Sequence, residues 1–456
     1  MTALLAPGAA AQAGEAIATQ RVSLTAGSAV TDFQCKPRSR RAAPRPPEPD
    51  PLEPPGEEDL AALLQAQGPA GAPATGLSLL PPVGERLRVA VWGDSHMAAA
   101  FFTEELMRLA GLDVALARPS LLPATFGRAG VRLPLRRHCA EGDWRYESAH
   151  VASVDAATSG PGLVAMVASR PGAAIALDLR TVRGGEAGPL RLLYEADGAP
   201  LRVALALDGG EPTEVDLQAR PGPAALEIAV DAPVSQLRLR LLTGTLRLQG
   251  LALAPASRAL LQLDVFGYPG ATAAGWARLP PEGLRPWLAA DAYDLVVMAY
   301  GTNEGNASPF DAAAYRQGVA AAVTNLRAAF PAARCVLIGP GDRGVLLRRS
   351  QKARAAATAR RAGPSVPPAA LLRYTQVHET IAGIQQQAAQ AAGCAFWSPL
   401  EAMGGPGSAY RWAREGLMAA DLIHFTVPGY QQLARAFAAA AGWSPASVLP
   451  ARPPAR

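Results

Sequence analysis

Apolar and polar positions change their pattern twice along the chain. From residue 86 onward, short continuous apolar runs such as Leu87–Trp92 alternate with longer amphipathic segments, the first over Met97–Ala110. Continuous apolar runs of this length are typical of buried strands, and strands that alternate with helices predict right-handed crossovers and a mainly parallel sheet. We predict further strands at Gly111–Ala117, Leu260–Phe266, Asp294–Tyr300, Cys335–Pro340 and Cys394–Trp397, and further helices at Asp311–Phe330, Leu371–Ala392 and Pro428–Ala441.

The helical period disappears between residues 148 and 256. Short apolar stretches recur there between turn signals such as Asp197-Gly198 and Gly209-Gly210, a spacing typical of a β-sandwich or jelly roll. We interpret this region as a separate module inserted into the α/β domain. Its strands are predicted at Gly162–Ala168, Ala173–Leu179, Leu190–Tyr194, Leu201–Leu207, Glu214–Leu217, Ala225–Val230, Gln236–Leu242 and Thr245–Leu253.

The remaining regions are predicted to be tethers. Residues 1–80 are rich in Pro, Ala and Gly and are expected to form a largely disordered leader, and residues 446–456 a tail. The α/β domain is then discontinuous, over residues 81–147 and 257–445, with the module at 148–256. The segment that ends at Ala11-Gln12-Ala13 resembles a signal cleavage site without the usual basic start, so export to a periplasm or secretion is expected.

Charge and cysteine content narrow the function classes. The net charge of +5 is modest for 456 residues, and the short basic cluster Arg38–Arg41 has no interleaved aromatic residues, so no nucleic-acid partner is expected. The sequence contains no run of eighteen apolar residues, so no membrane-spanning helix is expected. Four cysteines show no metal-binding spacing. Cys335 and Cys394 each begin a predicted strand and can be neighbours, bonded or free, whereas the states of Cys35 and Cys139 stay open.

Three polar clusters lie where strands end or a helix begins, and the carboxyl ends of parallel strands meet at one edge of a sheet. Ser95, after the first strand, is a candidate nucleophile, His424 its base, and Asp421 the acid that orients the imidazole. The backbone N–H of Ser95, the backbone N–H of Gly270 and the side-chain amide of Asn303 are candidate oxyanion donors. The clusters are Gly93-Asp94-Ser95-His96, Gly301-Thr302-Asn303-Glu304 and Asp421-Leu422-Ile423-His424.

Each of these residues also has a structural interpretation. Asp421 can cap a helix, Asn303 can occupy a turn, and Gly270 can permit a tight turn after Pro269. His96 follows Ser95 directly and is expected to be structural or to face the substrate, not to act as the base. Three other histidines have no carboxylate or cysteine partners at ligand spacing, so no metal site is expected; they are His138, His150 and His378.

Taken together, the blocks resemble those of the SGNH (GDSL-type) hydrolase family. The residues that carry the resemblance are Gly93-Asp94-Ser95-His96, Gly267-Tyr268-Pro269-Gly270-Ala271, Gly301-Thr302-Asn303-Glu304 and Asp421-Leu422-Ile423-His424, in the family's order. The resemblance implies a three-layer α/β/α, flavodoxin-like domain that hydrolyses esters through a seryl acyl-enzyme, without metal or organic cofactor. The leader and the arginine-rich loop Arg343–Arg361 have no role in the family pattern.

The residues of the blocks Gly93–His96 and Gly301–Glu304, together with the inserted β module, most resemble those of bacterial peptidoglycan O-acetylesterases. In those proteins the insert resembles a carbohydrate-binding module. This implies removal of O-acetyl groups from a cell-wall polysaccharide, with peptidoglycan the favoured substrate. Alternatives are acetyl-xylan or another carbohydrate ester, transfer of the acetyl group to a sugar, or a non-catalytic glycan-binding protein. Arg132, Arg136 and Arg137 are either solvated or contact substrate carboxylates. The oligomeric state stays open.

Overall fold

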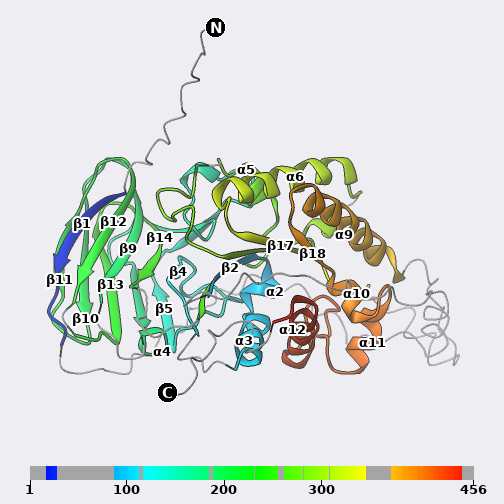
Figure 1. The fold of residues 1–456 in the computed structure, drawn as a ribbon. Helices are drawn as coiled ribbons and strands as arrows, with labels where there is room; N and C mark the ends of the chain where they lie inside the picture. Colours follow the sequence, from blue (N-terminus) through cyan, green and yellow to red (C-terminus); the bar gives the residue numbers. More distant parts are fainter. Residues whose placement is uncertain are drawn as a thin grey trace, which may run out of the picture.

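A computed structural model describes residues 17–27, 87–111, 117–183, 188–230, 232–254, 261–280, 282–307, 309–345 and 371–443. These residues form two lobes that lie side by side, a β-sandwich and an α/β lobe (Figure 1). Most of the predicted leader, the predicted tail and most of the arginine-rich loop lie outside the described residues. Among the helices that the structure does describe, none is long and apolar enough to cross a bilayer.

The α/β lobe is built on a sheet of six described strands in the order β18-β17-β16-β2-β15-β3. Every neighbouring pair in this order is parallel, as the alternation of strands and helices predicts. The continuous apolar run of β16 is buried at every position, because helices cover both faces. The strands are β2 (Leu87–Gly93), β3 (Ala117–Arg118), β15 (Leu261–Gly267), β16 (Leu295–Ala299), β17 (Arg334–Ile338) and β18 (Ala395–Trp397).

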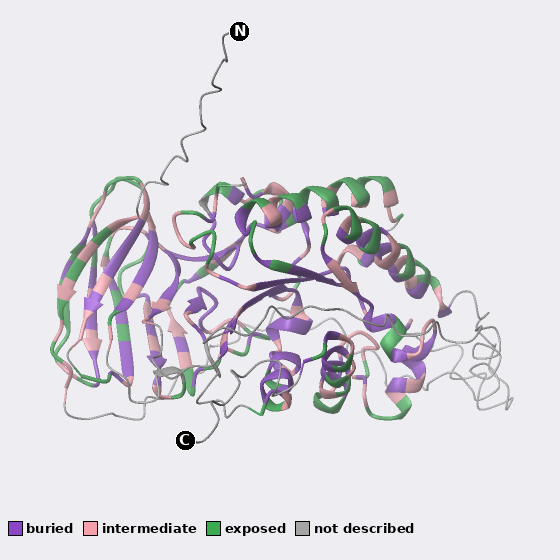
Figure 2. Cartoon of the chain, in the orientation of Figure 1, coloured by how far each residue is buried: buried purple, intermediate pink, exposed green. Residues whose placement is uncertain are grey.

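Helices lie on both faces of this sheet, and the sheet itself is mostly buried between them (Figures 1 and 2). Together the three layers give the α/β/α architecture expected from the sequence. One face carries α5 (Ala274–Arg278), α6 (Ala312–Ala329) and α9 (Arg373–Ala391). The other face carries α2 (Ser95–Ala98), α3 (Phe101–Leu109), α10 (Pro399–Met403), α11 (Ser408–Arg414) and α12 (Val427–Ala441). Two short 3-10 helices are η1 (Ala156–Thr158) and η2 (Glu304–Asn306).

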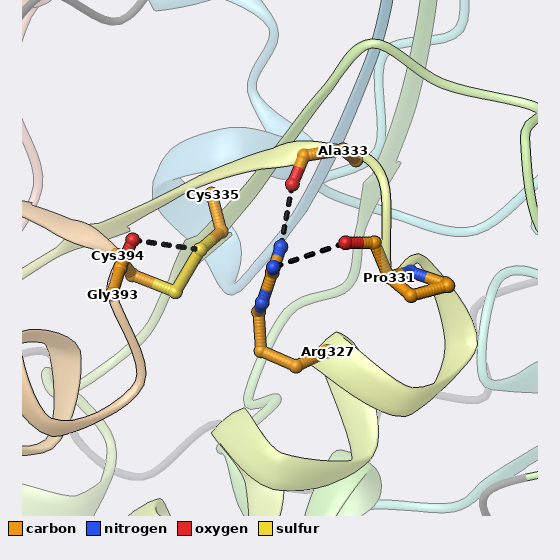
Figure 3. The surroundings of a disulfide bond; sticks show 6 residues. All are labelled: Arg327, Pro331, Ala333, Cys335, Gly393 and Cys394. Carbon is orange, nitrogen blue, oxygen red and sulfur yellow. Dashed lines mark hydrogen bonds between the residues drawn. A yellow bond between two sulfur atoms is a disulfide. The ribbon is translucent and has the colours of Figure 1, made fainter.

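A disulfide joins two neighbouring strands at the edge of the parallel sheet. Cys335 near the start of β17 is bonded to Cys394, which immediately precedes β18 (Figure 3). Beside it, Arg327 of α6 donates hydrogen bonds to the backbone oxygens of Pro331 and Ala333. In the chain-entropy description, closing a loop of 59 residues stabilises the fold by about 4 kcal/mol. The disulfide thus secures this strand pair at the end away from the strands' carboxyl ends.

The sandwich consists of two sheets, in the orders β1-β12-β9-β14-β7-β6 and β11-β10-β13-β8-β5, with β4 paired to β14. Their inward-facing Leu, Val and Ile side chains form one buried cluster between the sheets. The strands are β1 (Ala18–Ser23), β4 (Leu121–Pro123), β5 (Arg137–Glu141), β6 (Arg145–Ser148), β7 (Val164–Ala168), β8 (Ala174–Asp178), β9 (Leu190–Ala196), β10 (Leu201–Leu207), β11 (Thr213–Leu217), β12 (Gly222–Ala229), β13 (Gln236–Thr243) and β14 (Leu246–Leu253); α4 (Arg180–Arg183) follows β8.

The sandwich extends beyond residues 148–256, the limits expected from the sequence. Three of its strands, β4, β5 and β6, lie within residues 121–148, nearly all of which had been assigned to the α/β domain. A fourth, β1, comes from the predicted disordered leader and pairs in parallel with β12. Side chains in this part of the leader alternate between half-buried and exposed, so the strand depends on its partner more than on its own apolar content.

One local prediction at the start of the α/β lobe was wrong in extent. The helix expected over Met97–Ala110 is divided into α2 and α3, because Ala100 between them adopts a left-handed backbone with φ 61°. The Ala100 carbonyl then accepts hydrogen bonds from the N–H of Glu104 and the hydroxyl of Thr103, which starts α3 anew. Of the strand expected at Gly111–Ala117, residues 112–116 lie outside the described part of the chain, and the structure describes β3 at Ala117–Arg118.

The register of the sheet aligns the three strand ends on which the site depends. Gly93 of β2 is level with Gly267 of β15 and with Ala299 of β16. A Cβ at Gly267 would lie 2.2 Å from the backbone nitrogen of Ala98, so only glycine lets α2 cross the end of β15 this closely. Since the chain passes from β15 to β16 across β2, the loops after these strands meet where ligands bind in open α/β sheets.

Candidate active site

Ser95 and His424 meet at this edge although 329 positions separate them. Ser95 is the first residue of α2, immediately after the Gly93-Asp94 turn that ends β2. His424 lies in the loop before α12. The Ser95 Oγ is 3.0 Å from Nε2 of His424. A hydroxyl at this distance from an imidazole nitrogen is within reach of a general base, so the pair can form an activated nucleophile.

Asp421 holds the imidazole from its other side. Its Oδ2 is 2.7 Å from Nδ1 of His424, and its Oδ1 accepts hydrogen bonds of 2.9 Å from the backbone N–H groups of Ile423 and His424. Leu422 between them has a left-handed backbone, with φ 56°, which folds the loop back on itself. With a proton on Nδ1 shared with the carboxylate, Nε2 is left as the acceptor for the Ser95 hydroxyl.

The charges of this pair follow from the same hydrogen bonds. Burial favours the neutral acid, but the hydrogen bonds from His424 and the two backbone N–H groups outweigh it and hold the pKa of Asp421 at about 2. The hydrogen bond to Asp421 in turn raises the pKa of His424 above its ordinary value of 6.5, against the effect of burial. Asp421 therefore remains ionised, and the imidazolium that forms during proton transfer is stabilised.

His96 lies behind the base and does not contact the nucleophile. It is buried, its Nδ1 is 3.1 Å from the hydroxyl of Tyr430, and its ring centroid is 5.4 Å from that of His424. Burial lowers the pKa of His96, so it packs as a neutral ring beside the ring that becomes charged. This agrees with the structural interpretation of His96.

Two of the expected oxyanion donors lie in loops that are tied together. The side-chain amide of Asn303 donates a 2.9 Å hydrogen bond to the backbone oxygen of Ala271, which fixes its orientation. Gly270 is exposed and has φ 84°, a backbone that favours glycine. The N–H of Ala271 closes the turn on the Tyr268 oxygen at 3.0 Å. Gly270 thus has the turn role considered for it, and its loop is held beside Asn303.

Glu304 joins the same two loops, a role that the sequence analysis did not assign. Its carboxylate accepts hydrogen bonds from the backbone N–H of Ala273 at 2.8 Å and from that of Gly301 at 3.1 Å. Burial raises the pKa of Glu304 to about 7, although the Ala273 N–H acts in the opposite direction. The only signal in the sequence was an acidic residue directly after Asn303, which does not reveal a partner thirty residues earlier.

His150 supports the glycine-containing loop from the side of the sandwich. Its Nδ1 is 2.5 Å from the backbone oxygen of Thr272, and its ring lies 5.7 Å from that of Tyr300, centroid to centroid. Burial lowers the pKa of His150 to about 4, so the ring is neutral and donates to the carbonyl. A residue between two sandwich strands thus positions a loop of the α/β lobe.

The three arginines considered as substrate contacts lie in other segments. Arg132 is paired with Glu104 at 3.0 Å and stacks on Phe101, with its guanidinium carbon 4.3 Å from the ring centroid. Arg137 begins β5 of the sandwich, and Arg136 precedes it. None of them belongs to the loops that carry the serine, the asparagine or the acid–base pair. Within the described ranges, no cluster of three His, Cys, Asp or Glu side chains is suited to a metal ion.

Part of the chain matches a known protein family, and a solved structure shares its fold. Residues 247–432 match the sequence model of the GDSL-like lipase/acylhydrolase family, a range that holds the asparagine and acid–base blocks but not Ser95. No curated protein matches the chain. A solved structure described as "Peptidoglycan O-acetylesterase in action, 5 min" is 22% identical, with 81% of this chain and 97% of that chain covered and a TM-score of 0.50.

A family two carbohydrate esterase from Cellvibrio japonicus is 13% identical, with 67% of this chain and 98% of that chain covered and a TM-score of 0.25. Because both identities are low, the first structure shows a shared fold and nothing more. Nothing is inferred from the second structure, whose TM-score is 0.25. The family match and the first structure agree with the parallel sheet and its aligned loops. Residues 247–432 therefore form a domain that matches the GDSL-like lipase/acylhydrolase family, and the chain has the SGNH hydrolase fold, which is that of an ester-bond hydrolase.

Proposed function

We propose that the chain is a serine acetylesterase that removes O-acetyl groups from a cell-wall polysaccharide, with peptidoglycan as the favoured substrate. The observation that carries the proposal is the continuous hydrogen-bonded series from the Ser95 hydroxyl through His424 to Asp421. A nucleophile, a base and an orienting acid in contact are what acyl transfer requires.

In the proposed reaction, Nε2 of His424 takes the proton of Ser95 as Oγ bonds to the acetyl carbon and the carbonyl electrons move to its oxygen. Collapse of this intermediate breaks the bond to the sugar oxygen, which receives the proton from His424, and leaves acetyl-Ser95. Water then attacks, again losing its proton to His424, and acetate departs as the proton returns to Ser95. Asp421 stays ionised throughout and stabilises the imidazolium.

The oxyanion of both intermediates is assigned to the backbone N–H groups of Ser95 and Gly270 and to the amide of Asn303. One amide N–H of Asn303 is bound to Ala271, and we assign the other to the oxyanion. Removing one such donor typically lowers turnover about 100- to 1,000-fold. We expect Asn303→Ala to lower kcat on p-nitrophenyl acetate by this factor, while loss of the hydrogen bond to Ala271 lowers the melting temperature by only a few degrees. Less than a threefold loss would remove Asn303 from the proposed site.

The pH dependence follows from the state of His424. The base must be neutral in the free enzyme, and Asp421 raises the pKa of His424 above 6.5. As pH falls through that pKa the imidazole becomes charged and activity is lost, whereas Asp421, with a pKa of about 2, stays ionised. A profile of kcat/KM against pH is therefore expected to have an acidic limb with a midpoint above 6.5. A midpoint near 4 would point to a carboxylate as the base.

The substrate is tested by measuring acetate released from O-acetylated peptidoglycan and from acetyl-xylan under the same conditions. Preferential release from peptidoglycan supports the proposal, and preferential release from xylan supports the alternative of another carbohydrate ester. Transfer to a sugar acceptor would appear as acetylated acceptor in place of free acetate. Glycan binding by the chain without any esterase activity would favour the non-catalytic alternative, against which the assembled Ser95–His424–Asp421 series argues.

We also propose that the protein works in a periplasm or after secretion. The disulfide between Cys335 and Cys394 supports this, and Cys139 is disulfide-bonded as well. Stable disulfides are characteristic of oxidising compartments, where cell-wall polysaccharides are also found. Fractionation of cells that express the full chain, with the protein detected by antibody, tests this location; recovery of the protein only from the cytoplasm would contradict it.

A further inference from the structure

Two arginines stack on one tyrosine at the entrance to α9. The guanidinium carbon of Arg343 lies 4.1 Å from the ring centroid of Tyr374, and that of Arg373 lies 4.5 Å from it. Arg373 also donates a 2.6 Å hydrogen bond to the Tyr374 hydroxyl. Two positive charges are thus held close together by one aromatic ring, which offsets part of their repulsion through cation–π contact.

This cluster, which we call the arginine pair, borders the active site. The residue after Arg343, Gly344, donates a 3.0 Å backbone hydrogen bond to the carbonyl of Leu422, between Asp421 and His424. The Arg343 guanidinium itself donates to the side-chain oxygen of Asn306, three residues beyond Asn303. Arg343 therefore lies between the loop of the acid–base pair and the loop of the proposed oxyanion donor.

The hydrogen-bonding capacity of Arg343 is not filled. Its Nε is buried and has no hydrogen-bond partner, and within the described part of the chain neither arginine forms a salt bridge. The carboxylate whose charge acts on Arg343 is Asp421, which is already bound to His424 and two backbone N–H groups. A buried guanidinium N–H without an acceptor is costly, and a carboxylate matches the geometry of such donors.

The sequence that connects Arg343 to Arg373 is basic. Residues 346–370, between the two arginines, contain six basic residues and no acidic residue. An anionic ligand would be attracted to Arg343 and Arg373 themselves, whereas a neutral glycan would gain nothing from their charge.

We propose that Arg343 and Arg373, with Tyr374 as their support, form a subsite for a carboxylate of the acetylated glycan. The proposal rests on the proposed esterase function and makes the substrate class anionic, as in a polysaccharide of muramic acid type, and not neutral, as in acetyl-xylan. The carboxylate accepts hydrogen bonds from the two guanidinium groups while the acetyl ester lies at Ser95. Both arginines are specificity residues here, since they do not take part in bond making.

The test compares two competitors that differ by one carboxylate-bearing group. N-acetylmuramic acid and N-acetylglucosamine are titrated as inhibitors of p-nitrophenyl acetate hydrolysis by the full chain. We expect the acidic sugar to bind about tenfold more tightly, the typical effect of a charge-assisted hydrogen bond. Arg343→Gln and Arg373→Gln are each expected to reduce this preference, with Arg343→Lys and Arg373→Lys retaining part of it.

Arg285→Gln is the control, because Arg285 is an exposed arginine in the segment between α5 and β16 and its loss changes the net charge equally. If Arg343→Gln and Arg373→Gln leave the preference for the acidic sugar intact, or if Arg285→Gln reduces it as much, the subsite is refuted. Equal weak binding of both sugars to the unaltered chain would refute it too. Raising the ionic strength is expected to diminish the preference.

The same variants are then assayed for acetate release from O-acetylated peptidoglycan. We expect the ratio of kcat/KM on peptidoglycan to kcat/KM on p-nitrophenyl acetate to fall about tenfold in Arg343→Gln. A parallel loss on both substrates would show that Arg343 acts on the catalytic residues and not on substrate choice. If the unaltered chain releases no acetate from peptidoglycan, the proposed function fails, whereas the competitor experiment still decides the subsite.

Discussion

Ser95→Ala is expected to lower kcat on p-nitrophenyl acetate by at least about 10⁴-fold, the largest effect predicted for any single substitution. The hydroxyl that would form the covalent bond is lost, while His424 and Asp421 remain hydrogen-bonded to each other. Residual catalysis from the oxyanion donors and from substrate binding sets the lower limit. Steady-state kinetics with the purified variant measure the effect.

The control for Ser95→Ala is its melting temperature, which reports whether the fold is intact. Ser95 is only half-buried, and in the cap of its helix the N–H of His96 donates to the carboxylate of Asp94. Alanine at position 95 leaves this cap in place, so the melting temperature is expected to stay within a few degrees of the parent value. Activity within tenfold of the parent would mean that another residue carries the chemistry.

Asp421→Asn is expected to lower kcat by about 10³- to 10⁴-fold. The amide is nearly isosteric, but it is neutral, so it cannot stabilise the imidazolium, and its NH₂ can favour the wrong tautomer of His424. Because the hydrogen bond to Asp421 is the main cause of the raised pKa of His424, the acidic limb of kcat/KM is also expected to move to lower pH. Kinetics across a pH range measure both effects.

Asp311→Asn is the matched control for this variant. Asp311 caps α6 by accepting hydrogen bonds from the N–H groups of Ala313 and Ala314, and asparagine caps helices about as well. Its kcat is expected to stay within twofold of the parent value. If Asp421→Asn behaved like Asp311→Asn, Asp421 would be a structural cap, the alternative that the sequence left open.

The elements that the sequence predicted well are those with strong local patterns. β10 was expected and found at Leu201–Leu207, where alternate residues face the sandwich core. α6 begins directly after Asp311, the first residue of the helix expected from the sequence. β16 was found within a continuous apolar run because both its faces are covered. In each case the burial pattern is a property of the segment itself, which makes it visible without knowledge of its neighbours.

The features that were missed depend on distant neighbours. β1 is a strand because β12 offers it an edge, and the polar residues of β1 do not indicate this. The break at Ala100 involves no glycine or proline, so nothing in the local sequence marks the left-handed backbone there. Both outcomes are decided by tertiary packing, which overrides local propensity.

The same distinction applies to the residues of the candidate site, some of which were predicted and some of which were missed. The sequence nominated Ser95, Asp421 and His424 because each lies at the end of an element in one parallel sheet, and the structure brings all three into contact. Glu304 and His150 were not nominated for support of the glycine-containing loop. Their partners are backbone groups of Ala273 and Thr272. Every residue has such groups, so the sequence does not indicate which of them accept or donate a particular hydrogen bond.

The most direct test of the account is to locate the acyl group on the enzyme. The full chain is mixed with p-nitrophenyl acetate, quenched in acid within one turnover, digested and mapped by mass spectrometry. We predict a single acetyl group on the peptide that contains Ser95, absent from Ser95→Ala and accumulating in the burst phase. Acetyl transferred to a different residue at the same rate, with Ser95 unmodified, would contradict the account.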